Sequence, residues 1–189
     1  MLKKIGIALA VLILALVLVI ATRPATYRVT RSTTVSAPPA VAYAQVADFH
    51  RWDAWSPWAH LDPNMQTTFS GADGAVGASY SWKGNDQVGE GRMTIVEARP
   101  GEALGIRLEF LKPWQAVSST RFEFARAATG TRITWSMDGE NNFVAKAFSL
   151  VTDMDKMIGS DFERGLGSLK KAAEAETADA HVVLPAVAK

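Results

Sequence analysis

A charge-free apolar run near the N-terminus constrains the fold of this chain more than any other feature. Residues Ile5–Ala21 read IGIALAVLILALVLVIA, with one Gly and no charged side chain. As a helix, this run is about 25 Å long, at the short end of what spans the hydrocarbon core of a bilayer. Lys3 and Lys4 precede it, which favours an N-terminus that stays in the cytoplasm. The sequence therefore predicts a single-pass membrane anchor over residues 1–24 and an extracytoplasmic domain, periplasmic in a bacterium.

Two other interpretations of the apolar run stay open. It is also compatible with a cleaved signal peptide, in which Val19 and Ala21 would be the small residues before the cut. Against cleavage, the run is longer than the usual apolar region of about 7–15 residues, and Pro24 lies close to the cut. The third interpretation is a buried core helix. An anchor and a signal peptide send the domain to the same side of the membrane, so the expected location is the same for both.

Composition bounds the remainder of the chain. Hydrophobic residues make up 48% and charged residues 21%, which is typical of a packed globular domain. We expect one domain over residues 25–176 and a flexible tail over residues 177–189, where the helical periodicity fails. The chain has no cysteine, which excludes disulfides, thiolate metal sites and a cysteine nucleophile. Its net charge is +1 and it has no run of Lys and Arg, so nucleic acid is not an expected partner.

Alternation and turn residues predict seven strands with short antiparallel connections, and 3.6-residue periodicity predicts helices. We expect Ser36 to cap a short helix, a second short helix over 48–54, and Asn142 to cap one long helix over 143–175. The fold class is therefore α+β, a curved seven-stranded antiparallel sheet around a long C-terminal helix, with a cavity between them. The expected strands are 27–35, 65–70, 77–83, 88–98, 103–111, 114–126 and 130–139.

This element order and four local motifs resemble the SRPBCC superfamily, which includes START, Bet v 1-like and polyketide cyclase/dehydrase-type domains. The motifs are Ser36–Pro39 (SAPP), Phe49–Trp58 (FHRWDAWSPW), Gly91–Ile95 (GRMTI) and Trp135–Phe143 (WSMDGENNF). The most similar subgroup is bacterial and carries an N-terminal hydrophobic helix. Over residues 27–175, the resemblance implies a helix-grip fold with a deep hydrophobic cavity. The superfamily contains lipid carriers, hormone receptors and cyclases, and it implies no universal catalytic residue.

The candidate ligand-binding residues are mostly aromatic side chains and methionines. Trp52, Trp55 and Trp58 either form the rim of the cavity, plug the gap between the short helices and the sheet, or rest on lipid. A further set either lines the cavity or fills the core. Its members are Trp82, Met93, Phe110, Trp114, Trp135, Met137, Met154 and Met157.

Charged strand residues offer fewer candidates. Arg107 with Glu109, and Arg121 with Glu123, are spaced to share the convex, solvated face in ion pairs. Glu90 and Arg92 are the candidates for turning into the cavity, because Gly89 and Gly91 favour a bulge. His50, His60, Asp53 and Asp62 lack metal-binding spacing, and no cofactor motif is present, so neither a metal nor a cofactor is expected.

Three functions remain in contention. The first is binding of a hydrophobic or amphipathic, lipid-like small molecule in the cavity, with the membrane as a partner through the N-terminal helix. The second is a cyclase or dehydrase, which would need Glu90, Arg92 or Glu140 inside the cavity as acid or base. The third is an interaction or scaffold domain in the cell envelope. No sequence feature fixes the oligomeric state.

Overall fold

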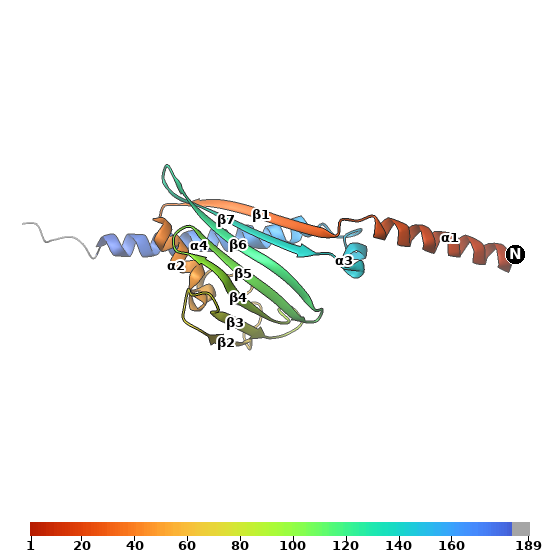
Figure 1. Ribbon diagram of the computed structural model, residues 1–189, viewed down its shortest axis with the longest axis horizontal. Coiled ribbons are helices and arrows are strands. Elements are labelled where there is room, and N and C mark those ends of the chain that lie inside the picture. Colours follow the sequence, from red (N-terminus) through yellow and green to blue (C-terminus); the bar gives the residue numbers. More distant parts are fainter. Residues whose placement is uncertain (183–189) are drawn as a thin grey trace, which may run out of the picture.

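The structure is a computed structural model that describes residues 1–182. It consists of an extended N-terminal helix, one curved sheet, and a long C-terminal helix packed inside the curve of the sheet (Figure 1). The helices are α1 (Leu2–Ala21), α2 (Pro39–Ala47), the 3-10 helix η1 (Phe49–Ala54), α3 (Phe143–Phe148) and α4 (Met154–Val182). The strands are β1 (Thr26–Val35), β2 (Gln66–Ser70), β3 (Ser79–Lys83), β4 (Glu90–Arg99), β5 (Ala103–Lys112), β6 (Ala116–Ala127) and β7 (Gly130–Glu140).

The seven strands form one antiparallel sheet in the order β1-β7-β6-β5-β4-β3-β2. From β2 to β7, each strand pairs with the next one along the chain, because the connections are short. The first strand, β1, lies beside the last strand, and α2 and η1 carry the chain from there to the far edge. The predicted α+β class and helix-grip arrangement are confirmed.

One face of the sheet, called the inner face below, packs against α4. Alternate strand residues such as Val29, Ile106 and Ile133 point to this face and are buried, and α4 contributes Phe162, Leu166 and Leu169 to the same core. The alternation follows from the two-residue period of a strand. The apolar residues of α4 are spaced three and four residues apart, so they form a single stripe along one side of the helix.

The expected single helix over 143–175 is wrong, because the chain forms two helices there. The Asn142 side chain accepts a hydrogen bond from the Ala145 N–H and caps α3, as predicted. The Asp153 side chain accepts one from the Lys156 N–H at 3.1 Å and starts α4 anew. An Asp that bonds local backbone in this way favours a new helix start over a helix interior. At the other end, α4 runs to Val182, past the expected start of the tail, and residues 183–189 lie outside the described part.

The sequence predicted that Ser36 caps α2, and this prediction is wrong. The helix starts at Pro39, with Pro38 at the N-cap position and no side-chain cap. Proline suits the first helical turn because its missing N–H would have no partner there. The Ser36 N–H donates instead to Glu174 Oε1 at 2.7 Å, which lowers the pKa of Glu174 and ties the end of β1 to α4.

The N-terminal helix α1 is long and apolar enough to cross a membrane. Ile20 is its one buried residue, near the contact of α1 with α3. A core helix would bury most of its side chains, so this exposure argues against the core-helix interpretation. An anchor and a signal sequence both remain consistent with α1.

Candidate binding site between the sheet and the C-terminal helix

Aromatic rings fill the space between α4 and the middle of the sheet. The ring of Trp135 on β7 stacks on Phe162 of α4, with centroids 3.9 Å apart and planes inclined by 7°. On β6, Phe122 stacks against the same indole at 4.8 Å. Trp55 and Trp58 meet Trp135 edge-on, which is a favourable arrangement for aromatic pairs. This part of the inner face, called the closed half below, is packed core.

Two of the three clustered tryptophans belong to that core. Trp52 and Trp55 are buried, and their indole N–H groups donate to the carbonyl oxygens of Val46 at 2.8 Å and Gln45 at 3.0 Å. These rings therefore plug the gap between the short helices and the sheet. Trp58 is half-buried against the edges of Trp135 and Phe162. Because Trp52 and Trp55 are covered by protein, neither rests on lipid.

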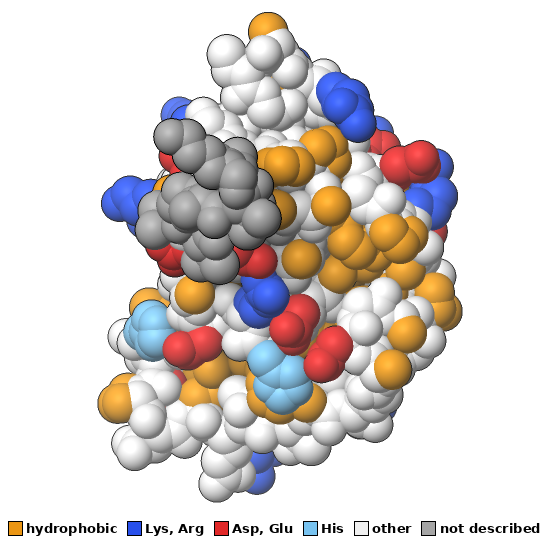
Figure 2. All heavy atoms as spheres, turned by 90° about the vertical axis from the view of Figure 1, so that its left-hand side faces the viewer, with side chains coloured by type: hydrophobic (Ala, Val, Ile, Leu, Met, Phe, Trp, Pro, Cys, Tyr) orange, Lys and Arg blue, Asp and Glu red, His pale blue; other side chains and the backbone are white. Residues whose placement is uncertain are grey.

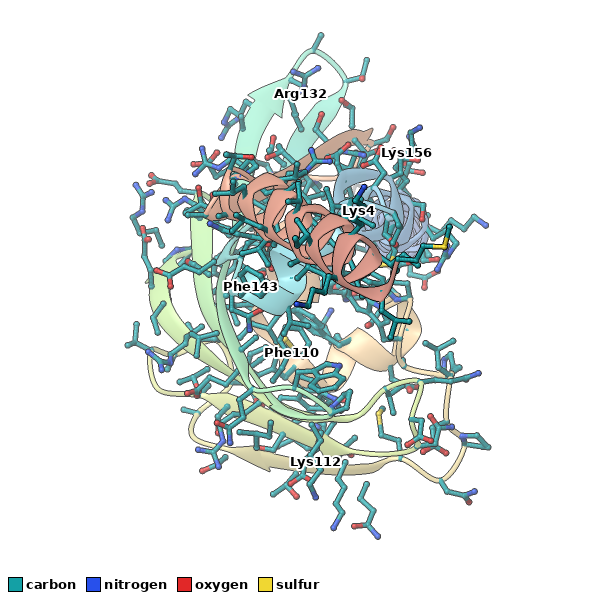
Figure 3. The ribbon with its side chains drawn as sticks, turned by 90° about the vertical axis from the view of Figure 1, so that its right-hand side faces the viewer. Lys4, Phe110, Lys112, Arg132, Phe143 and Lys156 are labelled. Atoms are coloured by element: carbon teal, nitrogen blue, oxygen red, sulfur yellow. The ribbon has the colours of Figure 1, made fainter. Side chains whose placement is uncertain are left out.

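Along β5, the inner face becomes progressively more exposed toward the end of the sheet that lies near α1. Ile95, Ile106 and Val29 are at most 1% exposed. Further along β5, Leu108 and then Phe110 are only half-buried, as is Trp82 on β3, whereas Met93 on β4 stays buried. Phe110 lies inside the curve of the strands, below α3 (Figure 3). This region, called the open half below, is an apolar surface that α4 does not seal.

Hydroxyl groups lie among the apolar side chains of the open half. The Tyr27 ring crosses Gly139, where a Cβ atom would collide with it, and its hydroxyl is 3.1 Å from Ser118 Oγ. Thr120, next to them on the inner face, is buried. Deeper in, the buried Trp135 Nε1 has no hydrogen-bond partner among the described residues. Of the residues that carry these polar groups, Tyr27 is half-buried and the others are buried.

The charged candidates lie on the outer face, contrary to expectation. The register does shift between Glu90 and Gly91, as the glycines suggested. However, Gly91 is the residue that points inward, against the Trp82 ring, so its two neighbours point outward. Arg92 Nε donates to Ser81 Oγ at 3.2 Å, and Glu90 pairs with Lys112 at 2.8 Å, which lowers the pKa of Glu90.

The other candidates divide between the open half and the surface. Met93 and Met137 are buried in the inner face, and Met154 is half-buried at the start of α4. The structure therefore brings Trp82, Met93 and Phe110 together on adjacent strands. Trp114 is 75% exposed in the β5–β6 turn, and Met157 is exposed on α4, so neither lines the inner face.

Arg31, which was not among the candidate residues, joins the edge of the sheet to α4. Its Nε donates to Glu163 at 2.8 Å and its Nη2 to Asp155 at 2.9 Å, and these carboxylates raise its pKa. The guanidinium passes over Gly159, where any Cβ atom would displace it. The signal was present in the strand pattern, since Arg31 shares a face with the buried Val29 and Val35.

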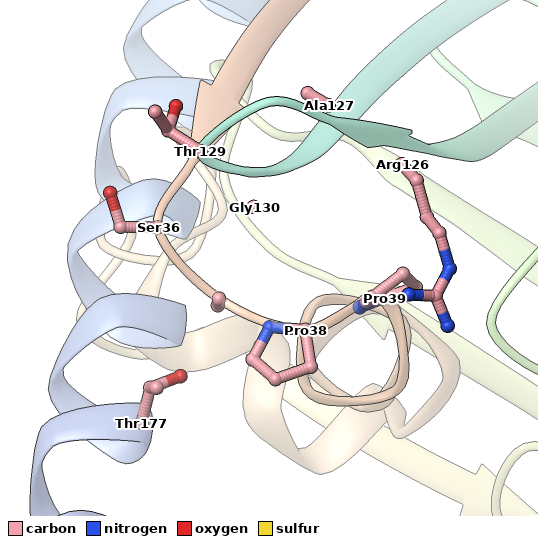
Figure 4. Close-up of a pocket in the computed structure, with 9 residues that line it drawn as sticks. Ser36, Pro38, Pro39, Arg126, Ala127, Thr129, Gly130 and Thr177 are labelled. Carbon is pink, nitrogen blue, oxygen red and sulfur yellow. The ribbon is translucent and has the colours of Figure 1, made fainter.

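Two surface pockets lie away from the open half. One, of about 500 Å³, lies between the start of α2, the β6–β7 turn and Thr177 of α4 (Figure 4). It is lined largely by small side chains and proline, and Arg126 is its one charged residue. The other, of about 290 Å³, contains Asp53, His60 and Asp62.

Two histidines lie beside acidic side chains at the end of the domain opposite α1 (Figure 2). His50 is 3.8 Å from Asp73, and His60 is 3.9 Å from Asp53. Asp62 accepts the N–H groups of Asn64 and Asn85 and so holds two loops. Within residues 1–182, no three His, Asp or Glu side chains gather in a way that suits a metal ion.

Comparisons with known proteins agree with this architecture. A family model described as polyketide cyclase/dehydrase and lipid transport matches residues 26–174. No curated protein matches the chain. A solved Aha1 dimer from Colwellia psychrerythraea has a TM-score of 0.57 at 16% identity, over 78% of this chain and 96% of that one. Protein CV1439 from Chromobacterium violaceum has a TM-score of 0.55 at 17% identity, over 80% and 99%.

A third solved structure is the di-domain ARO/CYC StfQ from the steffimycin biosynthetic pathway. It has a TM-score of 0.60 at 10% identity, over 82% of this chain and 52% of that one, so this chain spans about half of the di-domain protein. At these identities, the likeness to all three structures shows a shared fold alone.

Proposed function

The chain belongs to the polyketide cyclase/dehydrase and lipid transport family, and on that premise we propose that it binds a lipid-like small molecule. The ligand is hydrophobic or amphipathic, and it lies in the open half of the inner face. The observation that carries this proposal is the change in exposure along β5, from the fully buried Ile106 to the half-buried Leu108 and Phe110. An apolar concave surface with a few polar groups is the usual form of a small-molecule site.

The side chains of the open half suit an amphipathic ligand. Trp82, Met93, Leu108 and Phe110 supply apolar contact on three neighbouring strands. The Tyr27–Ser118 pair supplies hydroxyl groups at one side of this surface. Met adapts to ligands of different shape, which suits a site for flexible acyl chains.

In this proposal, α1 is retained as a membrane anchor and residues 25–176 form the binding domain on the extracytoplasmic side. Lys3 and Lys4, in the first turn of α1, favour that orientation. A tethered domain remains beside the bilayer, where lipid-like molecules are most concentrated. The tether thus supports the choice of ligand class.

The cyclase alternative is less well supported by the side chains on which it depends. Glu90 and Arg92 point to the outer face, and Glu140 is exposed at the end of β7. General acid or base catalysis requires such a group within hydrogen-bonding distance of the substrate. The open half instead offers hydroxyl groups and apolar surface, which favours binding over that chemistry.

A photo-crosslinking experiment in proteoliposomes tests the proposal. The full chain is irradiated with a diazirine-labelled fatty acid, and labelled peptides are identified by mass spectrometry. We expect labelling of peptides from β5 and β6, and a reduction of about tenfold in Leu108→Trp, because the larger ring fills the site. Labelling of α1 serves as an internal reference in every sample.

The matched control is Val96→Trp, which adds the same ring on the outer face, where Val96 is 52% exposed. This variant should label like the wild type, and near-ultraviolet circular dichroism should show that both variants are folded. Labelling confined to α1, or β5 labelling that is equal in Leu108→Trp and wild type, would contradict binding in the open half.

A further inference from the structure

Exposed apolar side chains gather at the end of the domain where α1 joins it. Two segments supply them: α3 with the loop that follows it, and the β5–β6 turn with the strand ends beside it. Both lie at the same end as α1 (Figure 1), and Phe143 projects from α3 at that end (Figure 3). We call this region the α1-side surface. Its residues are Leu111, Trp114, Val117, Phe143, Val144, Phe148 and Val151.

The exposure of these residues is unusually high for their type. Val151 is 84% exposed, Trp114 is 75% exposed and Val144 is 65% exposed. Single exposed apolar residues are common, but a group of them at one end of a domain indicates an interaction surface. The short helix α3 contacts α1 but has no buried residue, so its apolar side chains stay exposed.

The connection to α1 keeps this surface close to the end of that helix. Only residues 22–25 separate Ala21 at the end of α1 from the start of β1. Fully extended, four residues reach about 14 Å. In addition, the Asn141 N–H donates to the Ala25 carbonyl at 2.8 Å, and Asn141 Nδ2 donates to the Pro24 carbonyl at 3.2 Å. Asn141 directly precedes the cap of α3, so the connection and α3 are held together.

The length of α1 then places the α1-side surface at a defined depth. Its charge-free part, Ile5–Ala21, extends about 25 Å, which is at the short end of what spans the hydrocarbon core of a bilayer. If α1 spans the bilayer, its last residue lies at the boundary with the headgroups. The α1-side surface follows immediately, at the level where tryptophan and short amphipathic helices partition.

We propose that the α1-side surface inserts into the headgroup region of the bilayer that α1 spans. The helix α3 lies in the interface with Phe143, Val144 and Phe148 in contact with lipid, and Trp114 anchors the β5–β6 turn. This inference rests on the retained anchor of the proposed function, and it adds that the open half of the site faces the membrane surface.

The absence of cysteine from the sequence allows a direct test, because each introduced cysteine is the only one in the chain. Full-length variants Val144→Cys, Val151→Cys and Trp114→Cys are labelled with the environment-sensitive dye NBD. They are reconstituted in vesicles of phosphatidylethanolamine and phosphatidylglycerol, with and without lipids that carry a doxyl quencher near the headgroup. Leu12→Cys reports on α1 itself. Val76→Cys and Val96→Cys are controls, since both valines are well exposed but lie away from this end.

We expect the doxyl lipids to remove about half or more of the fluorescence at positions 144 and 114, and little at 76 and 96. If Leu12 is quenched and position 144 behaves like position 76, insertion is overturned while the anchor stands. If Leu12 is not quenched, the retained anchor of the proposed function fails as well. A blue-shifted but unquenched signal at 144 also overturns the proposal, because a protein, such as a second copy, would then cover the surface.

Discussion

The closed and open halves of the inner face are built from the same strands and the same alternation, yet they differ in what covers them. In the closed half, Phe162 of α4 stacks on Trp135, which in turn stacks on Phe122. In the open half, Leu108 and Phe110 extend the same pattern but stay half-buried. The comparison shows that the sheet supplies a continuous apolar surface, and the helix decides which part becomes core and which part remains available to a ligand.

Two local features set the boundary between the halves. Gly165 lets α4 approach closely, since a Cβ there would lie 2.9 Å from Trp135 Cζ3 and 3.0 Å from Pro57 Cδ. The cover ends where α4 begins, at the turn that Asp153 caps. A continuous helix over 143–175 would have covered more of the inner face. The break between α3 and α4 therefore helps to leave the open half uncovered.

The largest expected difference between the halves is in stability. Trp135→Ala should lower the free energy of unfolding by about 3–5 kcal/mol, because it leaves a cavity in a tightly packed stack. Phe110→Ala should cost less than about 2 kcal/mol, because the ring is only half-buried in the folded state. Chemical denaturation of the full-length protein in detergent, followed by circular dichroism, measures both values. Equal losses would show that the two halves are packed alike and would break the comparison.

Replacing two glycines of α4 by alanine should have smaller effects on stability, and the two effects should be opposite in sign. Replacing glycine by alanine inside a helix normally stabilises it by up to about 1 kcal/mol. Gly167→Ala should show this gain, since nothing lies within 4 Å of the new Cβ. Gly165→Ala should instead lower stability by about 1–3 kcal/mol, because rigid Trp135 and Pro57 atoms obstruct the methyl group. Thermal unfolding of both variants measures the difference, and a stabilised Gly165→Ala would mean that the closed half is loosely packed.

The sequence predicted the fold well because the fold depends on periodicity. Alternation at Leu104, Ile106 and Leu108 identified β5 and its inner face, and the resemblance to the SRPBCC superfamily is confirmed by the family match. The division of residues 143–175 into two helices was missed, since apolar spacing continues across the break. Asp153 favours a new helix start because its side chain binds local backbone, and the spacing of apolar residues does not reveal this.

The site was less predictable because it depends on which way single residues point. The bulge beside Glu90 was anticipated, but the direction of the side chains follows from Gly91 packing on Trp82, a contact between strands. Trp135 and Trp114 also looked alike in sequence. One proves to be core and the other lies in an exposed turn, a difference set by tertiary packing.

The smallest effect concerns Arg31, which holds α4 to the sheet edge beside the closed half. Its guanidinium lowers the pKa of Asp155 below the ordinary value of 3.8. The folded state thus favours the ionised carboxylate, and its contribution to stability is present above pH 3.8 and lost as the pH falls through the lowered pKa. Arg31→Met keeps the apolar stem but removes the charge. Its deficit in unfolding temperature relative to wild type should therefore be largest near about pH 7 and shrink toward about pH 3.

Arg28→Met is the matched control. Arg28 also forms an ion pair, with Asp138, but this pair joins β1 to β7 and does not involve α4. Both members of that pair are well exposed, so water and salt weaken it and its loss should matter less. Comparing the loss of unfolding temperature in the two variants separates the effect of the connection to α4 from the effect of removing a charge. A deficit for Arg31→Met that does not change with pH would assign its effect to packing over Gly159. The closed half would then be held by shape, without a contribution from the ion pairs at its edge.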